Sequence, residues 1–181
     1  TIPGTFLSVY FSSLTAYGIH VYDFKFKKFA WAFIMAVMMV PSQISIIGFY
    51  RFMLDLKLID TYVPLIIPTI AAPTVVFFMK QYMESNLPLE LVEAARIDGA
   101  GDFRILYSIV YPMCSSILTT VAVMVFIASW NDYVGPLMYL QDSKLYTLGI
   151  GLQMFKNAAQ PEWTLLMAAS TIFTVPLIVI F

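Results

Sequence analysis

Charge is scarce in this sequence. Asp, Glu, Lys and Arg make up 12% of its 181 residues, whereas hydrophobic types make up 60%. An average soluble domain is about 25% charged and about 45–50% apolar. So few ions cannot cover the apolar surface that such a chain would expose, which excludes an ordinary water-soluble globule. The ten basic residues do not outnumber the eleven acidic ones. A nucleic-acid-binding protein would carry a basic excess, so this class is excluded as well.

Chemically reactive side chains are scarce too. The single cysteine, Cys114, cannot form an intrachain disulfide, and the single histidine, His20, is more typical of a local hydrogen bond than of a metal ligand. The sequence contains no metal-ligand spacing, no Ser/His/Asp set and no phosphate-binding G-x-x-x-x-G-K-[ST] motif. We therefore expect no enzymatic activity, no metal site and no nucleotide site in this chain.

Long runs without charge are what the sequence does contain. Five segments lack Asp, Glu, Lys and Arg altogether: 3–22, 29–50, 61–79, 105–131 and 163–181. A helix rises about 1.5 Å per residue, so about 20 such residues cross a bilayer core of about 30 Å. A soluble helical bundle would show amphipathic stripes instead. The pattern predicts an all-α integral membrane protein, a polytopic helical bundle with five spans, and we expect further sequence at both ends.

The basic residues of the connecting loops predict the orientation of these spans. Cytoplasmic loops of membrane proteins carry the excess of Lys and Arg. The loops after the first and third spans hold six: Lys25, Lys27, Lys28, Lys80, Arg96 and Arg104. The loops after the second and fourth hold four: Arg51, Lys57, Lys144 and Lys156. Loops 23–28 and 80–104 are therefore expected in the cytoplasm, and 51–60 and 132–162 outside.

Prolines interrupt the predicted spans at positions 41, 64, 68, 73, 112 and 176. Each proline lacks a backbone N–H and so leaves one carbonyl without its helical hydrogen bond. In lipid this carbonyl needs another partner, such as a neighbouring helix, a Ser or Thr side chain, or water. Hydroxyl-bearing residues follow Pro112 closely, at positions 115, 116, 119 and 120. Backbone satisfaction and helix contact are the favoured interpretation of these residues. A polar path through broken helices is the alternative.

The connector 84–112 is long, charged and patterned as two short helices. Pro88 suits the first turn of a helix in which Leu89, Leu91, Val92 and Ala95 share one half and Glu90, Glu93 and Ile97 the other. Gly99 and Gly101 interrupt this helix. Asp102 is a plausible N-cap for the next helix, in which Phe103, Leu106 and Tyr107 recur at helical spacing. The exposed half is acidic with one apolar residue, which suits a protein partner better than a lipid surface, where basic faces are usual.

The same connector resembles a known family signature. Glu93-Ala94-Ala95, Gly99 four residues later, Ile109 and Pro112 match the EAA motif of the permease subunits of ABC importers, although Tyr111 stands where the motif has leucine. Further segments resemble the carbohydrate, maltose-permease-like branch of that family. They are MMVPSQ at 38–43, LIDTY at 58–62, WNDYVGPL at 130–137 and LYTLGIGL at 145–152.

This resemblance implies a type I ABC importer transmembrane fold over residues 1–181, with 84–112 as its cytoplasmic coupling loop. The coupling positions that it implies are Glu93, Ala94, Ala95, Ile97, Asp98 and Gly99. It also implies an ABC ATPase dimer that binds ATP and Mg²⁺, a second permease subunit, an extracellular solute-binding protein and a sugar substrate. The location would be a bacterial or archaeal plasma membrane.

Two further sets of residues are candidate contacts with these partners. Tyr139, Asp142, Tyr146 and Phe155 in the last outer loop are candidates for the solute-binding protein, or else for an interfacial aromatic belt. Gln43, Trp130, Asn131 and Asp132 offer the stacking and hydrogen-bonding groups that sugars need, although Asp132 could equally be a solvated loop residue.

Two alternative functions stay open at this point. A permease of the same family for a non-sugar solute, such as glycerol phosphate or an amino acid, would share these motifs. An ion-coupled secondary transporter would normally carry a charged residue within a span, and the five charge-free segments have none.

Overall fold

The secondary structure is entirely helical in the part of the chain described by the computed structural model, which covers residues 1–156 and 163–180. The elements are α1 (Ile2–Val21), α2 (Lys27–Met38), α3 (Ser42–Asp55), α4 (Val63–Ile66), η1 (Ile67–Ile70), α5 (Pro73–Asn86), α6 (Leu89–Ile97), α7 (Asp102–Ile105), the π-helix η2 (Leu106–Val110), α8 (Tyr111–Met113), α9 (Ser115–Asn131), α10 (Val134–Tyr139), η3 (Ser143–Leu145), α11 (Leu148–Lys156) and α12 (Trp163–Ile180). The predicted all-α class is confirmed for these residues.

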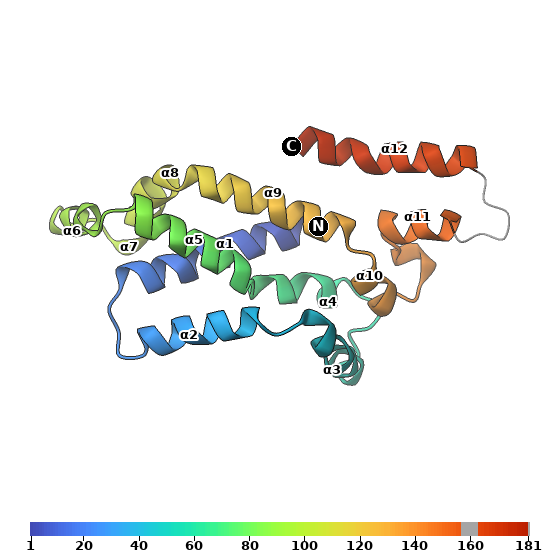
Figure 1. The fold of residues 1–181 in the computed structure, drawn as a ribbon, viewed down its shortest axis with the longest axis horizontal. Helices are drawn as coiled ribbons and strands as arrows, with labels where there is room; N and C mark the ends of the chain where they lie inside the picture. The colour runs from blue at the N-terminus through green and yellow to red at the C-terminus, as the bar shows by residue number, and fades with distance from the viewer. Residues whose placement is uncertain (157–162, 181) are drawn as a thin grey trace.

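Helices α1, α5 and α9 form the centre of the molecule and run side by side (Figure 1). The buried side of α1 repeats a small residue every fourth position, at Gly4, Ser8, Ser12 and Ala16. Small residues at this spacing let neighbouring helix backbones approach closely. A side chain at Gly4 would place its Cβ 3.3 Å from Cγ2 of Thr69, so the approach is already close at that end of α1.

The apolar core fills the space around these three helices. Val76, Met79 and Met83 on α5 recur at helical spacing and are buried against Ala16 and Tyr17 of α1. Helix α2 lies along α5, where Trp31 stacks on Phe77 with ring centroids 6.0 Å apart. Helix α6 projects beyond one end of this bundle, and α3, α10 and α11 gather at the other (Figure 1). We call these the α6 end and the α10 end.

The prediction of five spans is not confirmed. By length and composition, Val63–Asn86 and Trp163–Ile180 can each cross a membrane. Asp102–Met113 and Ser115–Asn131 add a third only if a pair bent by 82° counts as one span. The predicted span 29–50 is divided at Pro41 between α2 and α3. Helix α1 has 20 residues, but its many Ser and Thr residues and His20 dilute its hydropathy.

Pro112 interrupts the regular helix just before the bend at Cys114. Proline cannot donate to the carbonyl four residues earlier and its ring crowds that carbonyl, so a regular α-helix is disfavoured there. The chain forms the wider π-helix η2 just before this proline, as helices often do where the ladder is interrupted. Tyr111, which stands where the family motif has leucine, shares a hydrogen bond of 2.8 Å between its hydroxyl and the Oγ of Ser13 on α1.

Candidate functional site

The segment 87–102, which we call the elbow, forms the α6 end of the molecule. Leu87 is buried, and Pro88 is the N-cap of α6 with extended backbone, not part of its first turn as predicted. Glu90 lies in the first turn of α6 and Arg96 in its last. Each charge therefore has the sign that the helix dipole favours at its end, which supports a helix of only nine residues.

Helix α6 packs through a narrower face than the sequence predicts. Val92 is buried and Ala95 partly buried, but Leu89 and Leu91, which were expected on the same packed half, are exposed. The reason is that α6 extends past the ends of α1 and α5, so few neighbours surround it (Figure 1).

The open surface of α6 is acidic with an apolar centre. Its exposed side chains include Glu90, Glu93, Ala94 and Ile97, and Asp98 follows directly. Ile97 is 86% exposed, which is unusual for an aliphatic side chain without a partner. The carboxylates and the projecting Ile97 were predicted from the helical pattern, whereas the exposure of Leu89 and Leu91 was not. Such a surface suits a groove on another protein.

The turn after α6 depends on the backbone of Gly99. Its φ of +79° lies in the left-handed region, which L-residues with a Cβ adopt at a cost. Its N–H donates to the carbonyl of Arg96 over 3.0 Å, and the N–H of Ala100 donates to the carbonyl of Ala95 over 3.0 Å. These bonds satisfy the last carbonyls of α6 and end the helix.

Helix α7, at whose first residue the elbow ends, also departs from the prediction. Gly101 is the N-cap of α7, and Asp102 is its first helical residue. The Asp102 carboxylate accepts a hydrogen bond of 2.9 Å from Nη2 of Arg96 instead of capping the helix. Phe103, predicted to pack with Leu106, is exposed, while Ile105 and Leu106 are buried.

The α10 end holds the candidate contacts of the outer loop. Tyr139 is only 5% exposed and packs between Phe49 and Tyr50, at centroid distances of 5.7 and 6.2 Å. Asp142 is exposed and accepts from the N–H of Lys144, and Phe155 is exposed on α11. Tyr146 is partly buried. Contact between these residues and a solute-binding protein stays a prediction. The exposed Asp142 and Phe155 could make such a contact more readily than the buried Tyr139.

Asp60, which sequence analysis did not single out, organises that loop. Oδ1 of Asp60 accepts hydrogen bonds from the backbone N–H groups of Gln141 and Asp142, the latter over 2.9 Å. Its own N–H donates to the carbonyl of Tyr139 over 2.9 Å, and its φ is +60°. Asp tolerates left-handed backbone better than most residues. The LIDTY segment contains Asp60, but no local pattern reveals a contact with a loop so far along the chain.

The candidate solute residues lie apart from one another. Trp130 donates from Nε1 to the carbonyl of Phe173 over 3.1 Å and joins α9 to α12. Asn131 is exposed at the end of α9, and the side chain of Gln43 lies outside the described residues. Oδ1 of Asp132 accepts from the N–H groups of Val134 and Gly135. Asp132 also lines a cavity of about 310 Å³ together with Tyr62, Ser129 and Thr147.

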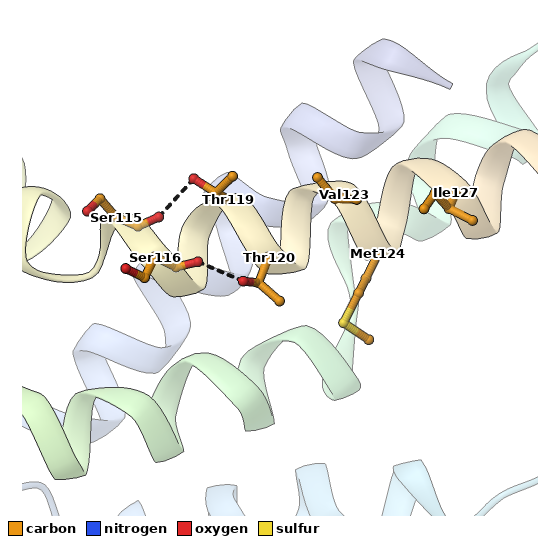
Figure 2. A pocket seen from close by; sticks show the side chains of 7 residues that line it. All are labelled: Ser115, Ser116, Thr119, Thr120, Val123, Met124 and Ile127. Atoms are coloured by element: carbon orange, nitrogen blue, oxygen red, sulfur yellow. Dashed lines mark hydrogen bonds between the residues drawn. The ribbon is translucent and has the colours of Figure 1, made fainter. Parts of the chain in front are cut away.

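A larger hollow of about 640 Å³ runs along α9 (Figure 2). Its lining consists of four hydroxyl-bearing and three apolar residues: Ser115, Ser116, Thr119, Thr120, Val123, Met124 and Ile127. Figure 2 shows that the Thr119 and Thr120 hydroxyls donate to the carbonyls of Ser115 and Ser116, over 2.9 and 2.8 Å. These two hydroxyls therefore satisfy carbonyls of their own helix, as the favoured interpretation of the sequence expects.

Comparison with known proteins identifies relatives of this chain. Residues 8–181 match the family model described as binding-protein-dependent transport system inner membrane component. The arabinooligosaccharides transport system permease protein AraQ of Halalkalibacterium halodurans is 35% identical over 175 residues, covering 97% of this chain and 62% of the relative. The melibiose/raffinose/stachyose import permease protein MelC of Bacillus subtilis is 33% identical over 177 residues, 97% of this chain and 64% of the relative.

A third relative transports a different kind of solute. The sn-glycerol-3-phosphate transport system permease protein UgpE of Brucella abortus is 33% identical over 171 residues, covering 93% of this chain and 60% of the relative. The chain thus spans less than two thirds of the length of the curated relatives that it matches.

We predict that Gly99→Ala loosens the elbow whereas Gly101→Ala does not. A Cβ at either position would meet open space, so any difference between the variants reports backbone strain alone. Gly99 has a left-handed φ and Gly101 a φ of −73°. Forcing alanine into the left-handed region costs about 1–2 kcal/mol. Amide hydrogen exchange over residues 94–102 should accelerate in the first variant only, and equal exchange in both would contradict the prediction.

We predict that Asp60→Ala frees the loop at residues 140–142. The substitution removes the acceptor of two backbone N–H groups and places alanine at a φ of +60°. Exchange of the Gln141 and Asp142 amides should accelerate by about tenfold or more, which corresponds to about 1.4 kcal/mol. Asp60→Asn is the matched control because it keeps Oδ1 and tolerates left-handed backbone. Unchanged exchange in Asp60→Ala would show that the two bonds do not hold this loop.

Proposed function

The chain belongs to the family of binding-protein-dependent transport system inner membrane components, and we propose that it is the permease subunit of an ATP-driven importer of sugars or oligosaccharides. The named relatives are permease proteins, that is, transport components. Two of these relatives are named as permeases for oligosaccharides, at 33–35% identity over nearly the whole chain.

The observation that carries the proposal is the exposed surface of the elbow. Glu93 and Ala94 face outward on α6, and Ile97 projects among the carboxylates with no partner in the described part of the chain. An apolar side chain surrounded by charge is typical of a contact surface. We assign this surface to a separate ATPase dimer, because the sequence has no phosphate-binding loop of its own.

Within this proposal the coupling positions have distinct physical roles. Ala94 and Ala95 are small, so a partner surface can approach the backbone of α6 closely. Glu93 and Asp98 supply charge for basic groups of the partner, and Ile97 supplies the apolar contact. Gly99 sets the turn between α6 and α7, because its backbone is left-handed.

The proposed mechanism is a shift between two states of the membrane helices. ATP and Mg²⁺ bound by the partner ATPases would favour their closed form, and α6 would move with them. A ligand shifts such an equilibrium only through a difference in affinity for the two states. Inverting a ratio from about 1:99 to 99:1 requires about 5.5 kcal/mol. We assign that free energy to ATP binding together with docking of an extracellular solute-binding protein.

The proposed topology keeps the five crossing segments of the sequence prediction. They correspond to α1, α2 with α3, α4 with α5, α7 to α9, and α12, with the elbow in the cytoplasm and the α10 end outside. Interrupted helices of this kind are tolerated in a membrane where the free backbone groups are buried in protein or face a polar cavity. A second permease subunit would cover the α9 hollow and the exposed face of α12.

The lining of the two hollows favours an uncharged solute over glycerol phosphate. Among the described residues that line them none is Lys or Arg, and the smaller cavity contains the carboxylate of Asp132. A phosphate dianion would need basic partners and would be repelled by that carboxylate. Sugar hydroxyls can pair with the Ser and Thr oxygens of α9. Stimulation of ATP hydrolysis by a sugar-loaded binding protein, and not by one loaded with glycerol phosphate, is the expected result.

We predict that Glu93→Lys prevents the ATPase from docking. The change reverses the charge at the centre of the exposed surface of α6, so co-purification of the ATPase and solute-stimulated ATP hydrolysis should fall by about tenfold or more, that is, about 1.4 kcal/mol of binding free energy. Asp55→Lys is the matched control, since it makes the same charge change on the exposed end of α3 at the opposite end of the molecule. Normal ATP hydrolysis in the Glu93→Lys complex would refute the assignment.

A further inference from the structure

A cluster of charged and aromatic side chains joins the elbow to α1. Nη2 of Arg96 on α6 donates to Oδ1 of Asp102 on α7 over 2.9 Å. The guanidinium carbon of Arg96 also lies 5.0 Å from the ring centroid of Tyr22, the residue that caps the C-terminus of α1. Tyr22 in turn meets the ring of the buried Tyr17 edge-on, at a centroid distance of 6.1 Å. We call Tyr17, Tyr22, Arg96 and Asp102 the Arg96 cluster.

A second contact ties the beginning of α6 to the same helix. Nε2 of His20, in the last turn of α1, is hydrogen-bonded to the carbonyl of Leu87 over 3.1 Å. Leu87 directly precedes Pro88, the N-cap of α6. The last turn of α1 and its cap therefore contact the elbow at both ends of α6, while Val92 packs between these points in the core. Two separated attachments prevent α6 from pivoting about Val92 alone.

We propose that the Arg96 cluster makes α6 and α1 move as one body, so that displacement of the elbow reaches α1 directly and not only along the chain through α5 and α7. Arg96, Asp102 and Tyr22 are positioning residues in this proposal, because they touch neither solute nor nucleotide. The inference rests on the proposed function, in which the elbow is moved by a partner ATPase.

The chemistry of the cluster suits a geometric role better than a stabilising one. The side chains of Arg96 and Asp102 are 38% and 51% exposed, and exposed ion pairs contribute little to stability. A guanidinium, however, is planar and can hold a carboxylate in its plane while its face lies over an aromatic ring. The hydrogen bond to the Asp102 carboxylate raises the pKa of Arg96 above its ordinary value, which shows that this contact favours the charged guanidinium. The cluster therefore fixes the angle between α6, α7 and the end of α1.

We predict that breaking the cluster separates ATP hydrolysis from transport. The protein is the complete importer reconstituted in vesicles, and the readout is the ratio of sugar imported to ATP hydrolysed. Asp102→Asn and Tyr22→Ala should lower this ratio by about threefold or more, while the ATPase stays bound and solute-stimulated hydrolysis stays within about twofold. Tyr22→Phe should keep at least half of the ratio, because it retains the aromatic ring next to the Arg96 guanidinium.

The control is the second ion pair of the described chain. Lys80 and Glu84 also form an ion pair, with side chains 12% and 44% exposed, and Nζ of Lys80 lies 4.2 Å from the ring centroid of Trp31. These residues belong to α5 and α2, and none belongs to the elbow. Glu84→Gln should leave the ratio unchanged. The inference is overturned if Asp102→Asn and Tyr22→Ala both keep a normal ratio of sugar imported to ATP hydrolysed while the ATPase is bound. It is also overturned if Glu84→Gln lowers this ratio as much as they do. Failure of the unaltered protein to bind any ATPase would instead refute the proposed function.

Discussion

The close approach of α1 to α5 and α9 is the constraint on which the other features depend. In a membrane, lipid tails are as apolar as the helix surfaces, so contact between helices relies on van der Waals packing and hydrogen bonds. The stripe of Gly4, Ser8, Ser12 and Ala16 gives α1 the flat surface that such packing needs. The elbow is therefore held between two segments that contact α1: α5, which leads into it, and η2, which follows it after α7 and whose Tyr107 hydroxyl donates to the hydroxyl of Tyr10 over 3.2 Å.

Local signals in the sequence explain why the elbow could be predicted. Its helix is short, and its end is marked by Gly99, whose left-handed backbone few other residues adopt without cost. The exposed acidic surface around Ile97 follows from helical spacing alone, so the sequence predicts it correctly. Leu89, Leu91 and Phe103 were assigned to packed faces wrongly, because spacing shows which residues share a side of a helix but not how far that helix extends beyond its neighbours.

Contacts between distant segments could not be predicted. In the sequence Arg96 is only one of six basic loop residues. Its contact with Tyr22 depends on the fold. Asp60 likewise has no local feature that indicates a bond to Gln141 and Asp142. The continuity of the predicted spans could not be foreseen for a related reason. Absence of charge shows that a segment tolerates lipid, whereas Pro41 and Pro112 determine whether its helix is continuous.

The two ends of α1 connect the features that lie far apart in the molecule. At the α6 end its last turn and cap hold the elbow through His20 and Tyr22. At the other end Gly4 lies against Thr69 of η1, and the short segment α4 beside it contacts α10. The Asp60 turn, just before α4, holds the loop that follows α10. A helix of 20 residues spans about 30 Å, so one rigid element can carry a displacement between these two ends. Motion of the elbow can therefore change the geometry of the α10 end without any change in the conformation of α1 itself.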